Sequence, residues 1–142
     1  GDADGEINGS IYDPGLLAKG ANINLDIDDD GRVNGTTDGI LIARALNNFS
    51  NDILTQGALG SNANRTDPTD IKDFINDLKN TLAMDVDNDG RVNGTTDGIL
   101  IARALNNFSN DILTQGALGS NANRTDPTEI NAFIDDLADL GI

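Results

Sequence analysis

The chain of 142 residues contains no cysteine and no histidine. Without cysteine it can form no disulfide and offers no thiolate to a metal ion. Without histidine it lacks the commonest general base and the commonest transition-metal ligand. The composition therefore excludes a zinc site built from these residues, and it excludes any catalysis that depends on them.

Tryptophan is also absent, and aromatic residues make up only 4% of the chain, so we expect an aliphatic core. No apolar run approaches the roughly 18 residues of a membrane span, and no signal peptide is visible, so we expect a mature fragment without such a span. The 24 acidic and 9 basic residues give a net charge of −15. That charge disfavours nucleic acid as a partner.

Much of the acidic charge lies in two segments, which we call the first acidic loop (residues 26–38) and the second acidic loop (residues 85–97). Each places acids at positions 1, 3 and 5, glycine at position 6, asparagine at position 9 and aspartate at position 13. A hard cation such as calcium takes about 6 to 8 oxygen ligands arranged in this alternating order. The predicted ligands are Asp26, Asp28, Asp30, Asn34 and Asp38 with the Arg32 carbonyl, and Asp85, Asp87, Asp89, Asn93 and Asp97 with the Arg91 carbonyl.

Electrostatic repulsion supports this prediction. Two carboxylates about 4 Å apart repel by about 4 kcal/mol at an effective dielectric constant near 20, so converging aspartates need a cation. The alternative is an acidic surface turn without metal. The presence of two full copies of the pattern favours the metal site over that alternative.

The closing aspartate lies at position 13, whereas the usual EF-hand loop closes with glutamate at position 12. The additional residue lies around Gly35–Thr37 in the first acidic loop. Bidentate closure by Asp38 and Asp97 is therefore a weaker prediction than ligation by the first three acids of each loop.

A partial copy of the loop pattern stands at the start of the chain. It places Asp2 and Asp4 at positions 3 and 5, and the carbonyl of Glu6 at position 7. This is either a third calcium site whose first position precedes Gly1 or a degenerate one. Asp13 is a candidate replacement ligand.

From residue 22 the chain repeats with a period of 59 residues, and residues 31–69 are identical to residues 90–128. We therefore divide it into an N-terminal segment (1–21), a first repeat (22–80) and a second repeat (81–142). Each repeat is expected to be all-α, with about three helices: an apolar one after the acidic loop, a short one beginning near Ser50, and an amphipathic one capped by Asp67-Pro68. The apolar helix should lie at the centre of its unit.

A polar segment with Asn62, Asn64 and Thr66 precedes the amphipathic helix, and Asn121 begins its second copy. Its spacing is compatible with a vestigial ion-binding loop that has lost its charge. The alternative is a loop that only caps the helix.

The pattern D-x-[DN]-x-D-G-x-V-N-G-T, running directly into Asp-Gly-Ile-Leu-Ile-Ala-Arg-Ala-Leu, resembles the dockerin family and EF-hand-like repeats of secreted and cell-surface bacterial proteins. The resemblance covers residues 26–49 and 85–108. It implies a tandem calcium-folded loop-helix architecture, a secreted or cell-surface location and a cohesin-like protein partner. The partner-binding residues it implies are Gly35, Thr36, Arg44, Gly94, Thr95 and Arg103, although glycine at position 10, the 13-residue loop and the long period depart from the family pattern.

Four functions compete. We favour a calcium-stabilised structural or spacer module of an extracellular protein, with a dockerin-type docking module as the alternative. A cytosolic calcium sensor would need a methionine-rich groove, and Met84 is the only methionine. An enzyme is not expected, because the acids stand in ion-binding order and no aromatic sugar platform accompanies them. Since each acidic cluster closes within its own repeat, we expect the two sites to bind ions independently.

Overall fold

The computed structural model describes residues 24–140, so the predicted N-terminal loop with Asp2, Asp4, Glu6 and Asp13 lies outside the described residues. The prediction of an all-α chain is confirmed for the part that is described, which contains six α-helices and no strand. We call residues 24–80 the first half and residues 81–140 the second half. The elements are η2 (Gly35–Gly39), α2 (Ile40–Leu46), α3 (Asn51–Thr55) and α4 (Pro68–Asn80), then η3 (Gly94–Gly98), α5 (Ile99–Leu105), α6 (Asn110–Thr114) and α7 (Pro127–Leu140), where η marks a π-helical turn.

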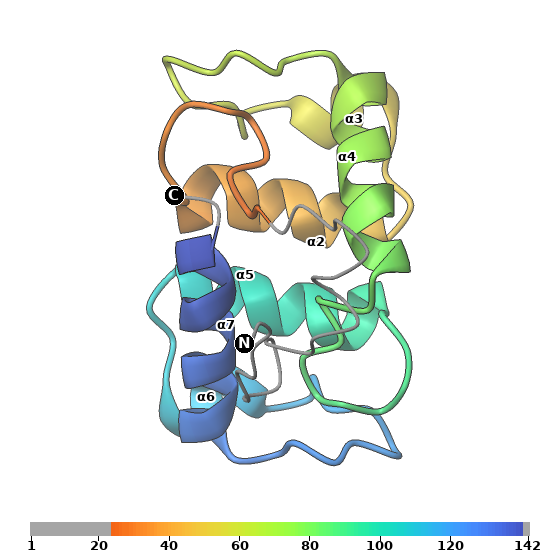
Figure 1. The fold of residues 1–142 in the computed structure, drawn as a ribbon, viewed down its shortest axis with the longest axis vertical. Helices are drawn as coiled ribbons and strands as arrows, with labels where there is room; N and C mark the ends of the chain where they lie inside the picture. Colours follow the sequence, from red (N-terminus) through yellow and green to blue (C-terminus); the bar gives the residue numbers. More distant parts are fainter. Residues whose placement is uncertain (1–23, 141–142) are drawn as a thin grey trace, which may run out of the picture.

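Helices α2 and α5 lie side by side at the centre of the molecule, and α4 and α7 lie across them towards opposite edges (Figure 1). Leu41 and Ile42 of α2 are fully buried, as are Leu100 and Ile101 of α5. A helix that is apolar on nearly every side needs several neighbours, and α2 contacts η2, η3, α3, α4 and α5. The expected central position of this helix is confirmed.

The long helices α4 and α7 begin as the sequence predicts. The Asp67 carboxylate accepts a hydrogen bond from the backbone N–H of Thr69 at 2.8 Å, and Pro68 follows at the first helical position. The apolar positions at helical spacing face the core, with Ile71, Ile75 and Leu78 buried on α4 and Ile130, Phe133, Ile134 and Leu137 buried on α7. Lys72, on the outer side of α4, is half-buried, and its Nζ donates to the Phe49 carbonyl at 2.8 Å.

The short helix α3 is held from the side by α2. Arg44 Nη1 donates to the carbonyl oxygens of Leu54 at 3.1 Å and Gln56 at 2.7 Å, near the end of α3. Ser50 stands at the N-cap position of α3, but its side chain makes no capping hydrogen bond. Leu54 is buried, whereas Ile53 is 62% exposed. The helix therefore depends on Arg44 for polar contacts and on Leu54 for packing.

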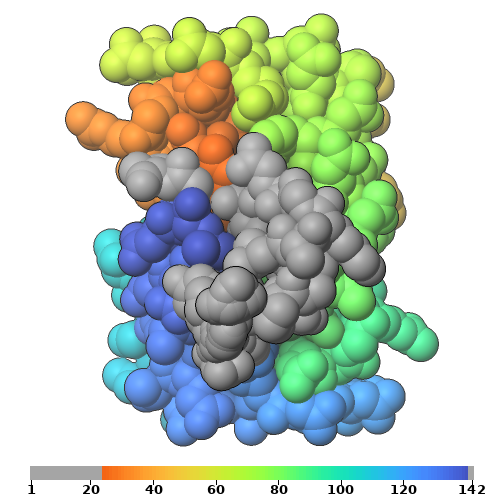
Figure 2. Space-filling model, viewed as in Figure 1, coloured from red at the N-terminus to blue at the C-terminus, as the bar shows by residue number. Residues whose placement is uncertain are grey.

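The two halves occupy opposite ends of the molecule in Figure 2 and share one hydrophobic core. A Cβ added to Gly39 would lie 3.3 Å from Ala102 Cα, and one added to Gly98 would lie 3.4 Å from Ala43 Cα. These glycines let each π turn approach the helix of the opposite half closely. None of the helices in residues 24–140 has the length and apolarity needed to cross a membrane.

Candidate metal centre

Each acidic loop gathers four carboxylates into one cluster. Asp26, Asp28, Asp30 and Asp38 each place one oxygen within 4.8 Å of those of the others. Asp85, Asp87, Asp89 and Asp97 form the same arrangement in the second half. Asp28, Asp38, Asp87 and Asp97 are fully buried. The two clusters could each hold a metal ion, and they consist of the predicted carboxylates.

The additional residue of the 13-residue loop is absorbed by the π turn. In η2 the backbone N–H of Gly39 bonds to the Asn34 carbonyl at 3.1 Å, a five-residue step in place of the usual four. Gly98 and Asn93 make the same bond at 3.0 Å. The wider turn returns Asp38 to the loop, where it accepts from the backbone N–H of Ile27 at 2.6 Å and of Asn34 at 2.8 Å. The closing aspartate is therefore part of the cluster despite its position at 13.

Backbone amides orient the first carboxylates of the loop. Asp26 accepts from the N–H of Asp30 at 3.2 Å and from that of Gly31 at 2.9 Å. Asp30 accepts from the N–H of Arg32 at 2.9 Å. Gly31 adopts φ +91°, a conformation that few other residues tolerate, and so makes the sharp turn at position 6. Asp85, Asp89, Gly90 and Arg91 repeat these bonds.

Asp28 differs from the other acids of its cluster because one of its buried oxygens has no hydrogen-bond partner among the described residues. Its Oδ2 accepts from the N–H of Gly60 at 2.7 Å. Its Oδ1 is buried and has no hydrogen-bond partner among the described residues, and the same holds for Asp87 Oδ1. A buried carboxylate oxygen without a partner is costly unless something compensates its charge. Each cluster thus contains a buried oxygen that the described part of the chain leaves unsatisfied.

The clusters are also electrostatically unfavourable without a cation. Burial raises the pKa of Asp38 from its ordinary value of 3.8 to about 7, against the opposing effect of the Asn34 N–H, and the charge of Asp28 adds to the rise. The pKa of Asp97 rises to about 7 for the same reasons. Burial also raises the pKa values of Asp26 and Asp85. The hydrogen bonds from the surrounding described residues therefore do not offset the free-energy cost of burying these carboxyls in the ionised form.

The segment of residues 60–65 holds the first acidic loop from outside. Besides the Gly60 bond, the N–H groups of Asn64 and Arg65 donate to the Asp28 carbonyl at 3.0 and 2.9 Å. Arg65 Nη1 donates to the Ile27 carbonyl at 2.7 Å, while its guanidinium stacks 4.1 Å from the centre of the Phe74 ring. Sequence reasoning missed this role. The arginine that precedes the capping motif in both repeats was a signal that could have suggested it.

For the same segment, with Asn62, Asn64 and Thr66, the sequence leaves open a vestigial ion-binding loop or a loop that only caps the helix. Asn62 and Thr66 are exposed, and Asn64 Nδ2 donates to the Asp29 carbonyl at 2.9 Å. In the second half Asn121 is likewise exposed, and Asn123 Nδ2 donates to the Asn88 carbonyl at 3.0 Å. The segment supports the acidic loop through hydrogen bonds.

The remaining predicted residues divide into two groups. The side chains of Arg32 and Arg91 are exposed, and Asn34 and Asn93 are partly buried beside the closing aspartates. Thr36 and Thr95 are exposed, as a partner-binding residue would be. Arg44 and Arg103 instead donate to carbonyls around the short helix of their own half.

Comparison with protein-family models, curated proteins and solved structures gives no match to this chain. The resemblance to dockerins therefore rests on the motif alone. The geometry of the two clusters is the main indication of what the chain does.

Proposed function

We propose that the protein binds two calcium ions, one in each acidic loop, and that the ions stabilise the two helical halves. The observation that carries the proposal is the buried Oδ1 of Asp28 and of Asp87, each inside a group of four carboxylates and without a hydrogen-bond partner among residues 24–140. A cation satisfies that oxygen and reverses the sign of the repulsion among the acids. One ion would be held by Asp26, Asp28, Asp30 and Asp38, assisted by the Arg32 carbonyl and by Asn34, and the other by the equivalent residues of the second half.

Calcium fits this donor set better than other common ions. All predicted ligands are hard oxygens, which disfavours zinc and copper, whose sites favour nitrogen and sulfur. Magnesium demands near-ideal octahedral geometry and usually keeps several waters, whereas calcium accepts a larger, irregular set of protein oxygens. Four carboxylates and a neighbouring amide therefore favour calcium.

The role we propose is structural: a calcium-stabilised module of tandem EF-hand-like, dockerin-type loop-helix repeats in an extracellular protein. Four charges within 4.8 Å of one another repel by on the order of 3 to 4 kcal/mol for each pair at an effective dielectric constant near 20. Folding then depends on the ion, by RT ln(1 + [L]/Kd), or about 2.7 kcal/mol at a hundredfold excess over Kd. For an extracellular module of this kind we expect binding at about 10⁻⁴ to 10⁻³ M.

Docking of a cohesin-like protein remains the second candidate. The exposed side chains of Thr36 and Thr95 favour it. Arg44 and Arg103 weigh against it, because both guanidinium groups already hold backbone carbonyls within the chain. Calcium-dependent capture of a purified cohesin domain would support the docking role, and its failure would leave the calcium proposal unaffected.

Isothermal titration of metal-free protein tests the calcium proposal. We expect two calcium ions per chain, weaker binding of magnesium, and a rise in Tm on adding calcium. Asp28→Asn and Asp87→Asn should each remove one ion, because the amide keeps the shape but loses the charge. Asp52→Asn, at an exposed position on α3, is the matched control and should retain both. The proposal fails if calcium neither binds nor shifts the Tm.

A further inference from the structure

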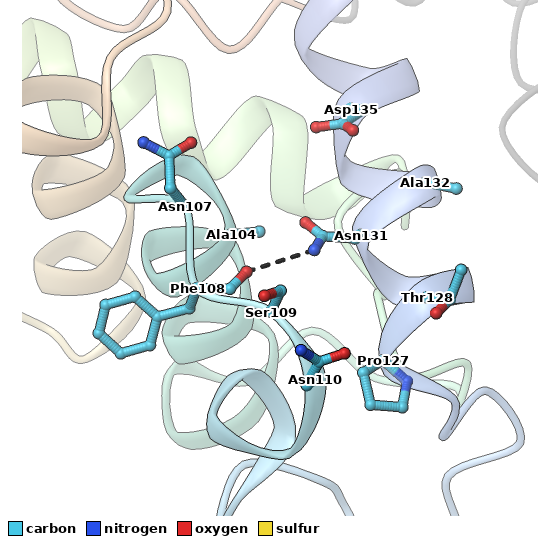
Figure 3. Close-up of a pocket in the computed structure, with 10 residues that line it drawn as sticks. All are labelled: Ala104, Asn107, Phe108, Ser109, Asn110, Pro127, Thr128, Asn131, Ala132 and Asp135. Atoms are coloured by element: carbon cyan, nitrogen blue, oxygen red, sulfur yellow. Dashed lines mark hydrogen bonds between the residues drawn. The ribbon is translucent and has the colours of Figure 1, made fainter.

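A cavity of about 460 Å³, open to the surface, lies between α7 and the segment that joins α5 to α6 (Figure 3). Its polar lining includes Ser109, Asn131 and Asp135, and Ala104, Pro127 and Ala132 supply apolar surface. Asn131 and Asp135 project from α7 toward the 107–110 segment (Figure 3). The cavity contains none of the predicted metal ligands, so it is separate from the calcium sites.

The internal repeat provides a built-in comparison for this cavity. Of its ten lining positions, seven carry the same residue in the first half. The three that differ all lie on the long helix: Asn131, Ala132 and Asp135 of α7 replace Lys72, Asp73 and Asn76 of α4. The second half therefore has a shorter neutral side chain in place of a long cationic one, and its carboxylate stands at position 135 instead of at the equivalent of Asp73.

In the first half, the primary ammonium group of Lys72 lies where the second half has the side-chain amide of Asn131. Lys72 Nζ donates to the Phe49 carbonyl at 2.8 Å. In the second half, Asn131 Nδ2 reaches the equivalent Phe108 carbonyl at 3.2 Å. A carbonyl oxygen has two lone pairs, so Phe108 can accept a second donor. In the first half, the carbonyl at this position therefore accepts a hydrogen bond from the primary ammonium group of a lysine in the same chain.

We infer that the cavity of the second half binds a primary alkylammonium group, such as the side chain of a lysine. The Phe108 carbonyl would accept from the ammonium, as the Phe49 carbonyl does from Lys72. Asp135 supplies the opposite charge, and Pro127 and the two alanines provide apolar surface for the alkyl stem. Burial and the charges of Asp139 and Asp136 raise the pKa of Asp135, and a bound cation would relieve that repulsion.

The test uses the full 142-residue chain in calcium-containing buffer, with its fold checked by circular dichroism. n-Butylammonium and Nα-acetyl-lysine methylamide are titrated while backbone amide shifts are followed by NMR. The expected result is a saturable shift centred on residues 107–110 and 128–135. Asn131→Lys, which recreates the first-half arrangement, should weaken binding at least tenfold. The triple change Lys72→Asn, Asp73→Ala, Asn76→Asp should create a second binding site in the first half.

Matched acidic variants separate a specific site from general attraction to an acidic surface. Asp135→Asn should weaken binding at least fivefold, whereas Asp136→Asn, on the same helix but outside the lining, should leave it within twofold. If n-butylammonium binds and Nα-acetyl-lysine methylamide does not, the ammonium assignment is supported and the ligand is a small amine, not the lysine of a peptide. Equal effects of the two aspartate variants, or unchanged binding by Asn131→Lys, would overturn the inference.

Discussion

The side-chain amide of Asn47, just beyond the end of α2, donates a hydrogen bond to the carbonyl of Gly94 at 3.1 Å, and Asn106 donates to Gly35 at the same distance. Each glycine opens the π turn that carries the closing aspartate of an acidic loop. Each candidate metal loop is therefore hydrogen-bonded to the helix end of the opposite half. The four carboxylates of each cluster come from one half, but the hydrogen bond that holds their π turn comes from an asparagine of the other half.

This crossed support predicts that Gly35→Ala destabilises the whole described domain. A Cβ at Gly35 would lie 2.5 Å from the Leu105 carbonyl, so α5 and η2 would have to separate. We expect a loss of about 1 to 3 kcal/mol, in the range of core overpacking. Urea unfolding followed by circular dichroism measures it. Thr36→Ala, exposed in the same turn, is the control and should change stability by less than about 0.5 kcal/mol.

Coupling between the two sites is the second prediction. Asp89→Ala should abolish calcium binding in the second half, and through η3 and Asn47 it should also weaken the first site several-fold. Isothermal titration of this variant measures the remaining site. Unchanged first-site affinity would support the independence expected from the sequence and would show that the crossed hydrogen bonds carry no coupling.

The sequence predicted the parts of this structure that depend on local pattern. The alternating acids of 26–30 and 85–89 identify the clusters because spacing along one short loop determines which side chains can converge. The i, i+3, i+4, i+7 series from Ile71 and the Asp67-Pro68 start likewise specify α4 through contacts within a few residues.

Most of the features that the sequence did not predict depend on contacts between distant segments. Gly60 lies 32 positions from Asp28, and Asn106 lies 71 positions from Gly35. No local pattern distinguishes a glycine that donates to a buried carboxylate from one that ends a helix. The π turn was also missed, because the additional residue indicates a longer loop without showing how the backbone accommodates it.

The third prediction concerns pH. Burial raises the pKa of Asp38 and Asp97 to about 7, whereas in the unfolded chain these carboxyls lose their protons near 3.8. Between those values the folded, metal-free protein binds more protons than the unfolded chain, so its stability should fall as the pH rises from about 4 to about 7. Above that range both states are ionised and the decline should stop.

Urea midpoints of metal-free protein across this range measure the effect, and carbon-detected NMR titration of Asp38 and Asp97 reports the two carboxyls directly. Saturating calcium should remove the decline, because the ion favours the ionised form, and calcium uptake near pH 6 should release protons. A stability that increases with pH in metal-free protein would contradict the raised pKa values.

The fourth prediction tests the supporting segment of residues 60–65. A Cβ at Gly60 would press on the Asp30 carboxylate and lie 3.1 Å from Asp28 Oδ2, the oxygen that the Gly60 N–H now holds. Gly60→Ala should therefore displace two ligands of the first site and lower its calcium affinity by about 10- to 100-fold, as loss of an outer contact to a metal ligand does. Isothermal titration should show the second site less affected.

The internal repeat supplies the control for this prediction. Gly119 has the same contacts with Asp87 and Asp89, so Gly119→Ala should weaken the second site by the same factor and affect the first site less. Ser61→Ala, exposed beside Gly60, should leave both sites unchanged. If both glycine variants bound calcium normally, the segment would serve only to connect α3 to α4. If each variant weakened mainly the site of its own half, and by the same factor, the segment that begins 32 residues after the aspartate would be shown to set the affinity of that loop.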